Sequence, residues 1–449
     1  DANVDIKGKN NLSGSNNPIQ IPSFESEESL YPLSTYVSDD YYGILSDING
    51  DWDSKSPKNY PLDLAIGRLP AKSKNEADLI VNKLIEAQSN LKNTNIAFIA
   101  DDEDYNIHLL DAEDFSKQLE EKAPQFVTQK IYLDAFPMQL TNGIYTSPET
   151  QKKVQNLFNY EAGLIHFIGH GSESGWTDEK IFTMNDIVQL KNNKNLPFLL
   201  TATCQFAKFD NPYILSGAEE LLCSDKGGAQ AIIGTSRPVF QSNNYLFGKN
   251  FYTILTGNSS NLSFKLGDLF KEVKNVSNVG IGNRNIVLLG DPSSPLPWMD
   301  TNISISTEHF TYGIPNEIEF VNTSGLVSTG ELKVYLPPNN LETLGTKSPK
   351  FKFKQAGKQL FQKNITISNG NLKVNLPTIT AQNTEPIQIR YNGQSNNHNF
   401  SSFKQLVTKN NGNNLADKEG PSIIQLAANS NQFLIADSSG IGNVDTNGN

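Results

Sequence analysis

Apolar and polar residues follow two different rhythms along residues 60–297. Short, continuous apolar runs are typical of strands buried on both faces of a parallel sheet. Such runs occupy residues 96–100, 163–168, 196–202, 229–234 and 285–290. Between them, apolar residues recur three or four positions apart, which is the pattern of amphipathic helices. The alternation of the two patterns predicts an α/β domain built around a sheet.

The helix signals are clearest just after residue 72. Ser73 and Glu76 form a capping box, and the apolar residues that follow it share one helical face. Those residues are Leu79, Ile80, Leu84, Ala87 and Leu91. The same spacing predicts further helices at 111–122, around 154–158, at 216–223, around 246–255 and around 264–273.

Beyond about residue 301 the apolar period changes to two, which is typical of half-buried strands. Leu332, Val334 and Leu336 alternate with polar neighbours. The strand ending at Ile367 is expected to pair with the strand starting near Leu372, because Asn369-Gly370 between them is a strong hairpin signal. This pattern predicts an all-β module, most simply a small sandwich.

The rhythm and composition divide the chain into four expected segments. Residues 1–35 form an extended, polar N-terminal segment, and residues 36–298 form the α/β domain. Residues 299–405 form the β-sandwich, and residues 406–449 form a linker and the start of a further module. The chain opens at Asp1 without an initiator Met, so we expect it to be part of a longer precursor.

Composition excludes several classes of protein. The formal net charge of −11 over 449 residues argues against a nucleic-acid partner, and the sequence has no Lys/Arg-rich run. Apolar stretches stay shorter than the roughly 18 residues that a membrane helix requires. Only Cys204 and Cys223 occur, which excludes a disulfide framework but leaves one bridge between them open. Cys223 lies beside apolar residues of a predicted helix and is interpreted as a core thiol.

Two of the predicted strands end in reactive side chains, His170 and Cys204. In a parallel sheet the carboxyl ends of the strands share one edge, where open α/β sheets bind their ligands. A thiol next to an imidazole is the minimum equipment for covalent acyl transfer, because the imidazolium stabilises the thiolate. The competing interpretation is a buried structural cysteine and a hydrogen-bonded core histidine.

Four carboxylates directly follow the strand at 96–100, namely Asp101, Asp102, Glu103 and Asp104. One of them could accept the far imidazole N–H of His170, as in a catalytic triad. The alternatives are a solvated acidic loop and a cation site. Gly171 leaves its backbone N–H unobstructed, so the N–H groups of Gly171 and Cys204 are candidates for an oxyanion hole.

Two other motifs compete with this site. Gly171 and Gly175 flank a segment that resembles a serine-hydrolase elbow, but its centre is Glu173, so that elbow is absent. A possible calcium loop is the second motif, because oxygen-bearing side chains there alternate with other residues around a glycine. Its candidate ligands are Asp47, Asn49, Asp51 and Asp53. The bidentate Glu of an EF-hand is missing, so a polar turn remains the alternative.

At these residues the chain resembles the gingipain-like cysteine peptidases. The motifs that carry the resemblance are Gly169-His170-Gly171-Ser172 with Trp176, the run from Leu196 to Cys204, and Leu289-Gly290-Asp291-Pro292-Ser293. The resemblance implies a caspase-like catalytic domain followed by an immunoglobulin-like module. It also implies that Cys204 is the nucleophile and His170 the general base, with Glu103 or Asp102 as the third member. It implies no cofactor for the chemistry, and the only metal expected is structural calcium.

Within this family the chain is most similar to the sortases of type IX secretion. The stretches that suggest this are Ser38–Gly43, Ala100–Asp104 with His108, and Lys350–Lys354. The resemblance implies an enzyme on the outer face of a Gram-negative outer membrane that removes the C-terminal signal domain of secreted cargo. Other secretion-system components and a surface glycolipid acceptor are then its expected partners. The alternatives are a broad secreted protease and a non-catalytic surface scaffold.

The substrate pocket is expected to depart from that of Arg-specific relatives. Those relatives use an acidic residue where this chain carries His108, and the neighbouring wall is expected at Phe240 and Gln241. Neither an aromatic ring nor an amide pairs well with a buried cation. We therefore expect poor cleavage after Arg or Lys and better cleavage at small or uncharged residues in an exposed linker. The alternative is that Asp111 or another acid turns into the pocket.

Overall fold

The computed structural model describes most of the chain between residues 22 and 444. The described ranges are 22–26, 32–46, 60–89, 94–211, 213–258, 264–277, 280–296, 302–380, 385–395, 398–409, 422–424, 433–437 and 440–444. The predicted calcium loop at Asp47, Asn49, Asp51 and Asp53 lies outside them. Among the described helices, none has the length and apolarity needed to cross a bilayer.

A six-stranded sheet forms the centre of the α/β domain, in the order β13-β12-β11-β7-β3-β4. Its strands are β3 (Asn95–Ala100), β4 (Val127–Tyr132), β7 (Leu164–Ile168), β11 (Phe198–Ala202), β12 (Ala231–Thr235) and β13 (Ile286–Gly290). All neighbours are parallel except β12 and β13. The sequence predicted five of these strands, but it gave no signal for β4.

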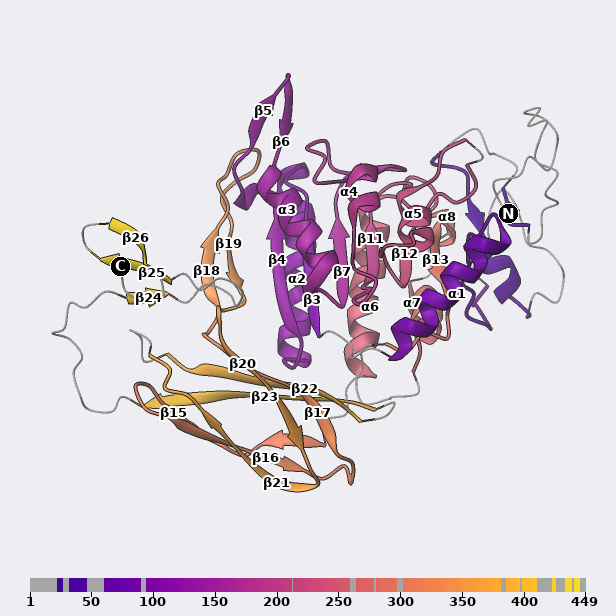
Figure 1. The fold of residues 1–449 in the computed structure, drawn as a ribbon. Helices are drawn as coiled ribbons and strands as arrows, with labels where there is room; N and C mark the ends of the chain where they lie inside the picture. Colours follow the sequence, from indigo (N-terminus) through magenta and orange to yellow (C-terminus); the bar gives the residue numbers. More distant parts are fainter. Residues whose placement is uncertain are drawn as a thin grey trace.

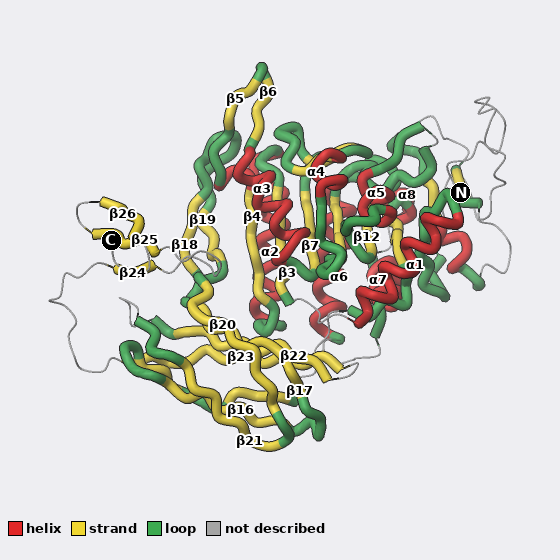
Figure 2. Tube along the Cα trace, viewed as in Figure 1, coloured by secondary structure: helices red, strands yellow, loops and turns green. Residues whose placement is uncertain are grey.

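Helices cover both faces of this sheet, as Figures 1 and 2 show. One face packs against α2 (Ile107–Lys122), α6 (Gln241–Gly257) and α7 (Leu266–Val276). The other face packs against α1 (Lys74–Ser89), α3 (Pro148–Asn156), α4 (Met184–Gln189) and α5 (Gly217–Cys223). Successive side chains of a strand point to opposite faces, so Phe98 joins the first core and its neighbours Ala97 and Ile99 the second. This two-sided burial explains the continuous apolar runs of the sequence.

Shorter elements connect this framework. Single-turn segments are η1 (Asp39–Gly43), η2 (Asp104–Asn106), η3 (Leu133–Ala135), the π-helical η4 (Leu157–Glu161) and the short helix α8 (Gly280–Arg284). Small antiparallel pairs are β1 (Phe24–Glu25) with β2 (Val37–Ser38), and β5 (Gln139–Thr141) with β6 (Ile144–Thr146). A three-stranded sheet follows His170 and comprises β8 (Gly171–Ser172), β9 (Gly175–Trp176) and β10 (Phe182–Thr183).

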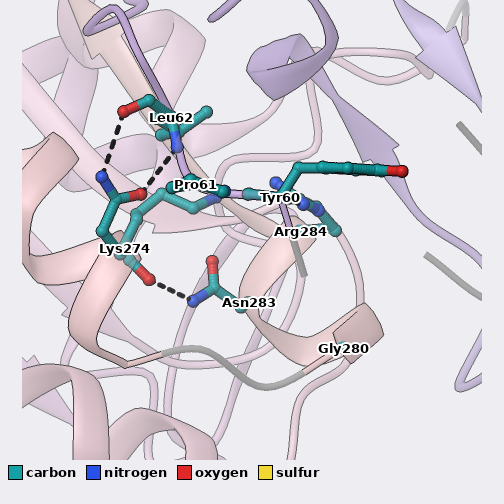
Figure 3. A pocket seen from close by; sticks show the side chains of 8 residues that line it. Tyr60, Pro61, Leu62, Lys274, Gly280, Asn283 and Arg284 are labelled. Atoms are coloured by element: carbon teal, nitrogen blue, oxygen red, sulfur yellow. Dashed lines mark hydrogen bonds between the residues drawn. The ribbon is translucent and has the colours of Figure 1, made fainter. Parts of the chain in front are cut away.

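A cavity of about 190 Å³ lies where residues 60–62 meet α7 and α8 (Figure 3). The side-chain amide of Asn275 binds both backbone groups of Leu62, at 2.7 and 3.0 Å. Lys274 and Arg284 contact the buried carboxylate of Asp40 at 2.7 and 3.0 Å. These polar groups therefore hold Asp40 and residues 60–62 onto α7 and α8. Among the described residues that line the cavity there is no predicted site residue.

The C-terminal module consists of two sheets that enclose one apolar core. The smaller sheet contains β14 (Ile303–Ile305), β16 (Asn316–Asn322) and β21 (Gly370–Leu376). The larger contains β15 (His309–Thr311), β23 (His398–Lys409), β22 (Ile387–Ser395), β17 (Ser328–Tyr335) and β20 (Gln359–Ile367). A separate three-stranded sheet comprises β24 (Ser422–Ile424), β25 (Phe433–Asp437) and β26 (Gly440–Val444).

The hairpin predicted across Asn369-Gly370 is wrong. β20 pairs with β17, whereas β21 pairs with β16 in the other sheet. The turn therefore carries the chain from one sheet to the other, and Ile367 and Val374 meet in the shared core from opposite sides. Because alternating apolar residues mark only the buried face of a strand, they cannot identify its partner.

A hairpin of β18 (Asn339–Glu342) and β19 (Lys352–Gln355) leaves this module and lies beside β4 of the α/β domain (Figure 1). Phe353 enters the core of the α/β domain, where its ring lies 4.7 Å from that of Tyr132. The sequence gave no signal for this hairpin. It joins the two parts of the chain close to the candidate site.

Candidate functional site

The ends of β7 and β11 bring His170 and Cys204 to the same edge of the sheet. The two strands are parallel and in register, with Ile168 opposite Ala202. His170 and Cys204 each follow these residues by two positions. The backbone N–H of Gly169 donates to the carbonyl of Ala202 at 3.3 Å, so the two loops leave the sheet side by side. The shared edge of the sheet that the sequence predicted for these two residues is present.

A sharp turn immediately after Cys204 presents the thiol at this edge. Gln205 has a φ of 62°, in the left-handed region. That conformation costs a residue with a side chain about 1–3 kcal/mol, and such residues concentrate at functional sites. The turn is held because the Thr235 hydroxyl donates to the Thr203 carbonyl and accepts from the Gln205 N–H at 3.1 Å. Cys204 is a free, half-buried thiol.

Gly171 lets the His170 loop approach the Cys204 loop closely. A Cβ atom at Gly171 would lie 2.5 Å from Oγ1 of Thr203 and 2.9 Å from the carbonyl oxygen of Gly175. No side chain larger than hydrogen fits this contact without displacement of the loop. The oxyanion-hole role of the Gly171 and Cys204 N–H groups stays a prediction.

Asp104 is the acid that contacts the imidazole of His170. Its Oδ2 lies 2.8 Å from Nε2 of His170, whereas Oε2 of Glu103 lies 3.9 Å away. Burial lowers the pKa of His170, but the hydrogen bond with Asp104 and the charges of Asp101, Asp104 and Glu103 outweigh it, so the pKa is raised overall. A carboxylate on Nε2 favours the tautomer with its proton on that nitrogen, which leaves Nδ1 as the basic atom.

The other two acids of the run have different partners. The carboxylate of Asp101 accepts from the backbone N–H groups of His170 and Asp102, each at 2.9 Å. A Cβ atom at Gly169 would lie 2.4 Å from Cβ of Asp101, so this glycine permits the contact. Asp102 was predicted to orient His170, but its buried carboxylate is 3.3 Å from Nζ of Lys347 instead. The Asp102 prediction is therefore corrected: this buried acid contacts Lys347 rather than the His170 ring.

The loop that carries Asp104 is strained. Asp104, Tyr105 and Asn106 have φ values of 55°, 54° and 68°, all in the left-handed region. Consecutive left-handed residues other than glycine are unfavourable and persist only where surrounding contacts impose them. α2 begins directly after this loop, four residues before the predicted helix start. No sequence signal distinguished Asp104 from its acidic neighbours, because the choice depends on this backbone conformation.

The three predicted pocket residues do not form one group. His108 is buried, its ring lies edge-on to that of His170 at 5.2 Å, and its Nε2 is 3.4 Å from Oδ2 of Asp104. Burial, with the neighbouring His170, lowers the pKa of His108. Phe240 is exposed, and Gln241 donates to Oδ2 of Asp111 at 2.5 Å. His108 thus packs against His170, while Gln241 engages Asp111, the acid that the sequence left open as an alternative for the pocket.

The second cysteine differs clearly from the first. Cys223 ends α5, and burial raises the pKa of its thiol to about 12. Both cysteines are free, so the bridge that the sequence left open does not form. A thiol protonated at neutral pH is a poor nucleophile. Cys223 is therefore the core thiol that the sequence predicted.

Three clusters of described acidic and histidine side chains have ligand atoms within 4.8 Å of one another. Two include His170, with Asp104 and His108 or with Asp101 and Glu103. The third comprises Asp101, Asp102 and Glu179, which are all buried. Lys347 extends its ammonium group to Glu179 and Asp102 of this third cluster.

Comparison with known proteins identifies the family of the chain. The model of peptidase family C25 matches residues 1–297, and no curated protein sequence matches the chain. Among solved structures, the Arg-specific cysteine proteinase gingipain R (RGPB) is similar, with 16% identity and a TM-score of 0.49 over 83% of this chain and 79% of the other. The complex of Porphyromonas gingivalis RgpB pro- and mature domains has 15% identity and a TM-score of 0.48, over 83% and 81%. The chain therefore belongs to peptidase family C25, the gingipain family of cysteine peptidases.

Proposed function

We propose that this peptidase is an endopeptidase of the type IX secretion sortase kind, similar to PorU, that removes the C-terminal signal domain from secreted cargo. His170 accepts the proton of the Cys204 thiol, and the thiolate attacks the scissile carbonyl carbon. The N–H groups of Gly171 and Cys204 stabilise the resulting oxyanion. His170 returns the proton to the leaving amine, and an acyl-enzyme remains on Cys204. Water, or the amine of a surface glycolipid, then releases the cargo.

The pairing of His170 with Asp104 supports catalysis over a vestigial scaffold. A hydrogen bond of 2.8 Å fixes the imidazole ring, and a strained loop is maintained to make it. Strain of this kind is retained where it serves a function. A scaffold that had lost its activity would gain stability by relaxing the loop.

The specificity proposal rests on one observation, the bond between Gln241 and Asp111. Asp111 is a buried acid near the predicted wall, and burial raises its pKa to about 6. The amide of Gln241 already occupies one of its oxygens at 2.5 Å. A pocket for Arg or Lys needs a carboxylate that faces the substrate cation, since an unpaired buried charge is costly. This engaged acid supports cleavage at small or uncharged residues in an exposed linker.

The same observation defines the second candidate, a broad secreted protease of the gingipain type. If a substrate guanidinium displaced the amide of Gln241, Asp111 would become the acid of a cation-binding pocket. The two candidates share the chemistry of Cys204 and differ in the side chain recognised.

The proposal extends to the C-terminal module and to location. Two sheets around one core support an immunoglobulin-like module, which we propose presents cargo and other secretion-system components to the peptidase. The site of action is then the outer face of a Gram-negative outer membrane. A structural calcium ion at Asp47, Asn49, Asp51 and Asp53 remains part of the proposal.

Mass spectrometry of candidate cargo after incubation with the protein tests the proposed function. The expected product is cargo cut once in the linker before its C-terminal domain. Its new C-terminus should be a free carboxyl group after hydrolysis, or an amide after attack by an added amine. Cys204→Ala should give no product, and Cys223→Ala should cut normally. Digestion throughout the cargo after Arg and Lys would instead support the gingipain-type protease.

A further inference from the structure

The loop between β18 and β19 binds the catalytic domain at Asp134, a buried residue that follows β4. Asp134 accepts from the backbone N–H groups of Gly345 and Thr346, each at 2.8 Å, through its two carboxylate oxygens. Its backbone carbonyl accepts from Leu344 at 2.7 Å. Phe353 anchors the base of the same hairpin in the core of the catalytic domain. The position of this loop relative to the catalytic domain is therefore well defined.

Two further hydrogen bonds join this loop to the loop that carries the acids. The Ser348 hydroxyl donates to the backbone carbonyl of Asp102 at 3.3 Å. The side-chain amide of Asn106 donates to the carbonyl of Pro349 at 2.6 Å. These contacts hold the strained segment Asp104–Asn106 on both sides, since Asp102 precedes it and Asn106 is its last residue.

Lys347 lies at the centre of this contact and extends its ammonium group into the acids. Its Nζ is 2.5 Å from Glu179, 3.3 Å from Asp102 and 3.3 Å from Glu103. The side chains of Asp102 and Glu179 are 0% and 3% exposed, so water does not screen them. Two buried carboxylates this close repel each other unless a cation compensates them. Lys347 supplies that cation.

The protonation of these groups agrees with this role. Burial and the charge of Glu179 raise the pKa of Asp102 to about 6, and Lys347 opposes that rise. Burial lowers the pKa of Lys347, but its bonds and charge interactions with Glu179 and Asp102 outweigh the effect and leave the pKa raised. Lys347 is thus a cation at neutral pH, where it can compensate these acids.

Glu103 connects this cation to His170. Its Oε1 lies 3.3 Å from Nζ of Lys347, and its Oε2 lies 3.9 Å from Nε2 of His170. Asp104, the next residue, makes the short contact with the imidazole. The ammonium group therefore holds the segment whose geometry decides which acid reaches His170.

We propose that Lys347 is a positioning residue of the peptidase, contributed by the C-terminal module, which holds the Asp102–Asp104 segment against His170. The proposal rests on His170 acting as the base of the cysteine peptidase and is independent of which cargo is cut. The β module then completes the active site as well as any role it has toward partners. Removal of the cation releases the strained segment and lowers turnover without removing a group that touches substrate.

Lys347→Met tests this directly, and Lys350→Met on the same exposed loop is the matched control for the loss of one charge. Small displacements of catalytic groups can cost up to about 100-fold in rate, so we expect kcat to fall by about 10- to 100-fold with KM little changed. Lys350→Met should keep wild-type values, and Lys347→Arg should recover part of kcat. Cys204 alkylation by iodoacetamide across pH reports the same geometry without a peptide substrate. We expect its pH midpoint to shift in Lys347→Met.

Glu179→Gln in the Lys347→Met background separates positioning from stability. This double variant loses one uncompensated buried charge, so its Tm should recover while kcat and the alkylation profile stay impaired, because Glu103 still has no cation. Recovery of all three, or wild-type kcat in Lys347→Met, would overturn the proposal. If Cys204 of the wild-type enzyme is alkylated normally but no cargo is cut, only the proposed function is contradicted. The pH dependence of Cys204 alkylation in Lys347→Met then decides the role of Lys347.

Discussion

Oδ2 of Asp104 lies 2.8 Å from Nε2 of His170, although Asp104 has a backbone φ of 55°. Tyr105 and Asn106 share this left-handed conformation, so the contact is made from a strained loop. His170 and Asp104 are about half exposed, at 48% and 57%. Solvent therefore weakens the pair electrostatically, and its main effect is to fix the tautomer and orientation of the ring.

Asp104→Asn should lower kcat by at least tenfold but less than the roughly 10⁴-fold loss known for a buried triad acid. The amide retains the shape of the side chain but not the charge that raises the pKa of His170. The basic form of His170 then appears at lower pH, so the acidic limb of the pH–rate profile should shift to lower pH. Glu103→Gln, at 3.9 Å from the ring, should have the smaller effect. A larger loss in Glu103→Gln would make Glu103 the orienting acid, as the family resemblance implied.

Cys204 should react with iodoacetamide at neutral pH much faster than Cys223. Burial raises the pKa of the Cys223 thiol to about 12, so almost none of it is thiolate. Peptide mapping after brief alkylation should find the label on Cys204, with activity lost in proportion. Loss of activity that follows labelling of Cys223 would contradict the assignment.

Gly171→Ala should impair catalysis more than folding. The added methyl group would lie 2.5 Å from Oγ1 of Thr203, which forces the two catalytic loops apart. Because misplacement by about 1 Å can cost about 100-fold in rate, we expect kcat to fall at least tenfold. Gly257→Ala at the end of α6 is the control, since a Cβ atom there meets nothing within 4 Å.

Thr203→Ala in the Gly171→Ala background removes the nearest clashing atom and should restore part of kcat. The carbonyl of Gly175 still opposes the methyl group at 2.9 Å, so recovery should be incomplete. Wild-type turnover in Gly171→Ala alone would show that the two loops have room to separate.

The sequence predicted most of the catalytic fold because burial on both faces leaves a continuous apolar run. The run at 96–100, for example, became β3 with only one boundary residue added. β4 escaped prediction because Lys130 stands in its middle, buried against Glu113 and Glu120 of α2, each at 3.1 Å. A charged residue can be buried in a strand only where an opposite charge pairs with it. The partners of Lys130 come from another element, so the sequence of the strand does not reveal them.

In the candidate site, too, the sequence predicted the residues that depend on local pattern and missed those that depend on distant contacts. The strand ends identified His170 and Cys204, because the register of a parallel sheet follows from the fold. The choice of Asp104 over Asp102 depends on three consecutive left-handed residues, a conformation that Asp and Asn adopt singly but that no local signal predicts as a run. Lys347 lies more than 240 residues from Asp102 and Glu103. The pattern of apolar and polar residues along the chain therefore cannot predict that Lys347 pairs with these acids.

Asp101 should make the stability of the protein depend on pH. Burial raises its pKa to about 7 from an ordinary value of 3.8, even though two backbone N–H groups bind the carboxylate. Between these values the folded state binds more protons than the unfolded state, so the free energy of unfolding falls as pH rises from about 4 to about 7. Asp101→Asn removes this contribution.

Urea denaturation at a series of pH values measures the contribution of Asp101 as the difference in the free energy of unfolding between the wild type and Asp101→Asn. The difference should change steadily across this window and become constant above about pH 8. Exposed Asp178→Asn is the control and should show no such slope. A constant offset for Asp101→Asn at every pH would mean that Asp101 titrates like an exposed aspartate.

The bond between Gln241 and Asp111 should decide which residue the enzyme accepts before the cut. In the wild type the carboxylate of Asp111 is engaged at 2.5 Å and buried, so a peptide library should show poor cleavage after Arg or Lys. Gln241→Ala removes the amide and leaves the carboxylate without its partner, which favours a cationic side chain in its place. Cleavage after Arg or Lys should therefore rise in Gln241→Ala relative to cleavage after uncharged residues, and Asp111→Asn added to it should abolish the gain.

Asp114→Asn, one turn further along α2 and paired with Lys249 at 2.6 Å, is the control and should leave the cleavage profile unchanged. A wild-type preference for Arg or Lys that disappears in Asp111→Asn would instead make Asp111 the acid of a gingipain-type pocket, because the substrate cation would then displace Gln241 by itself.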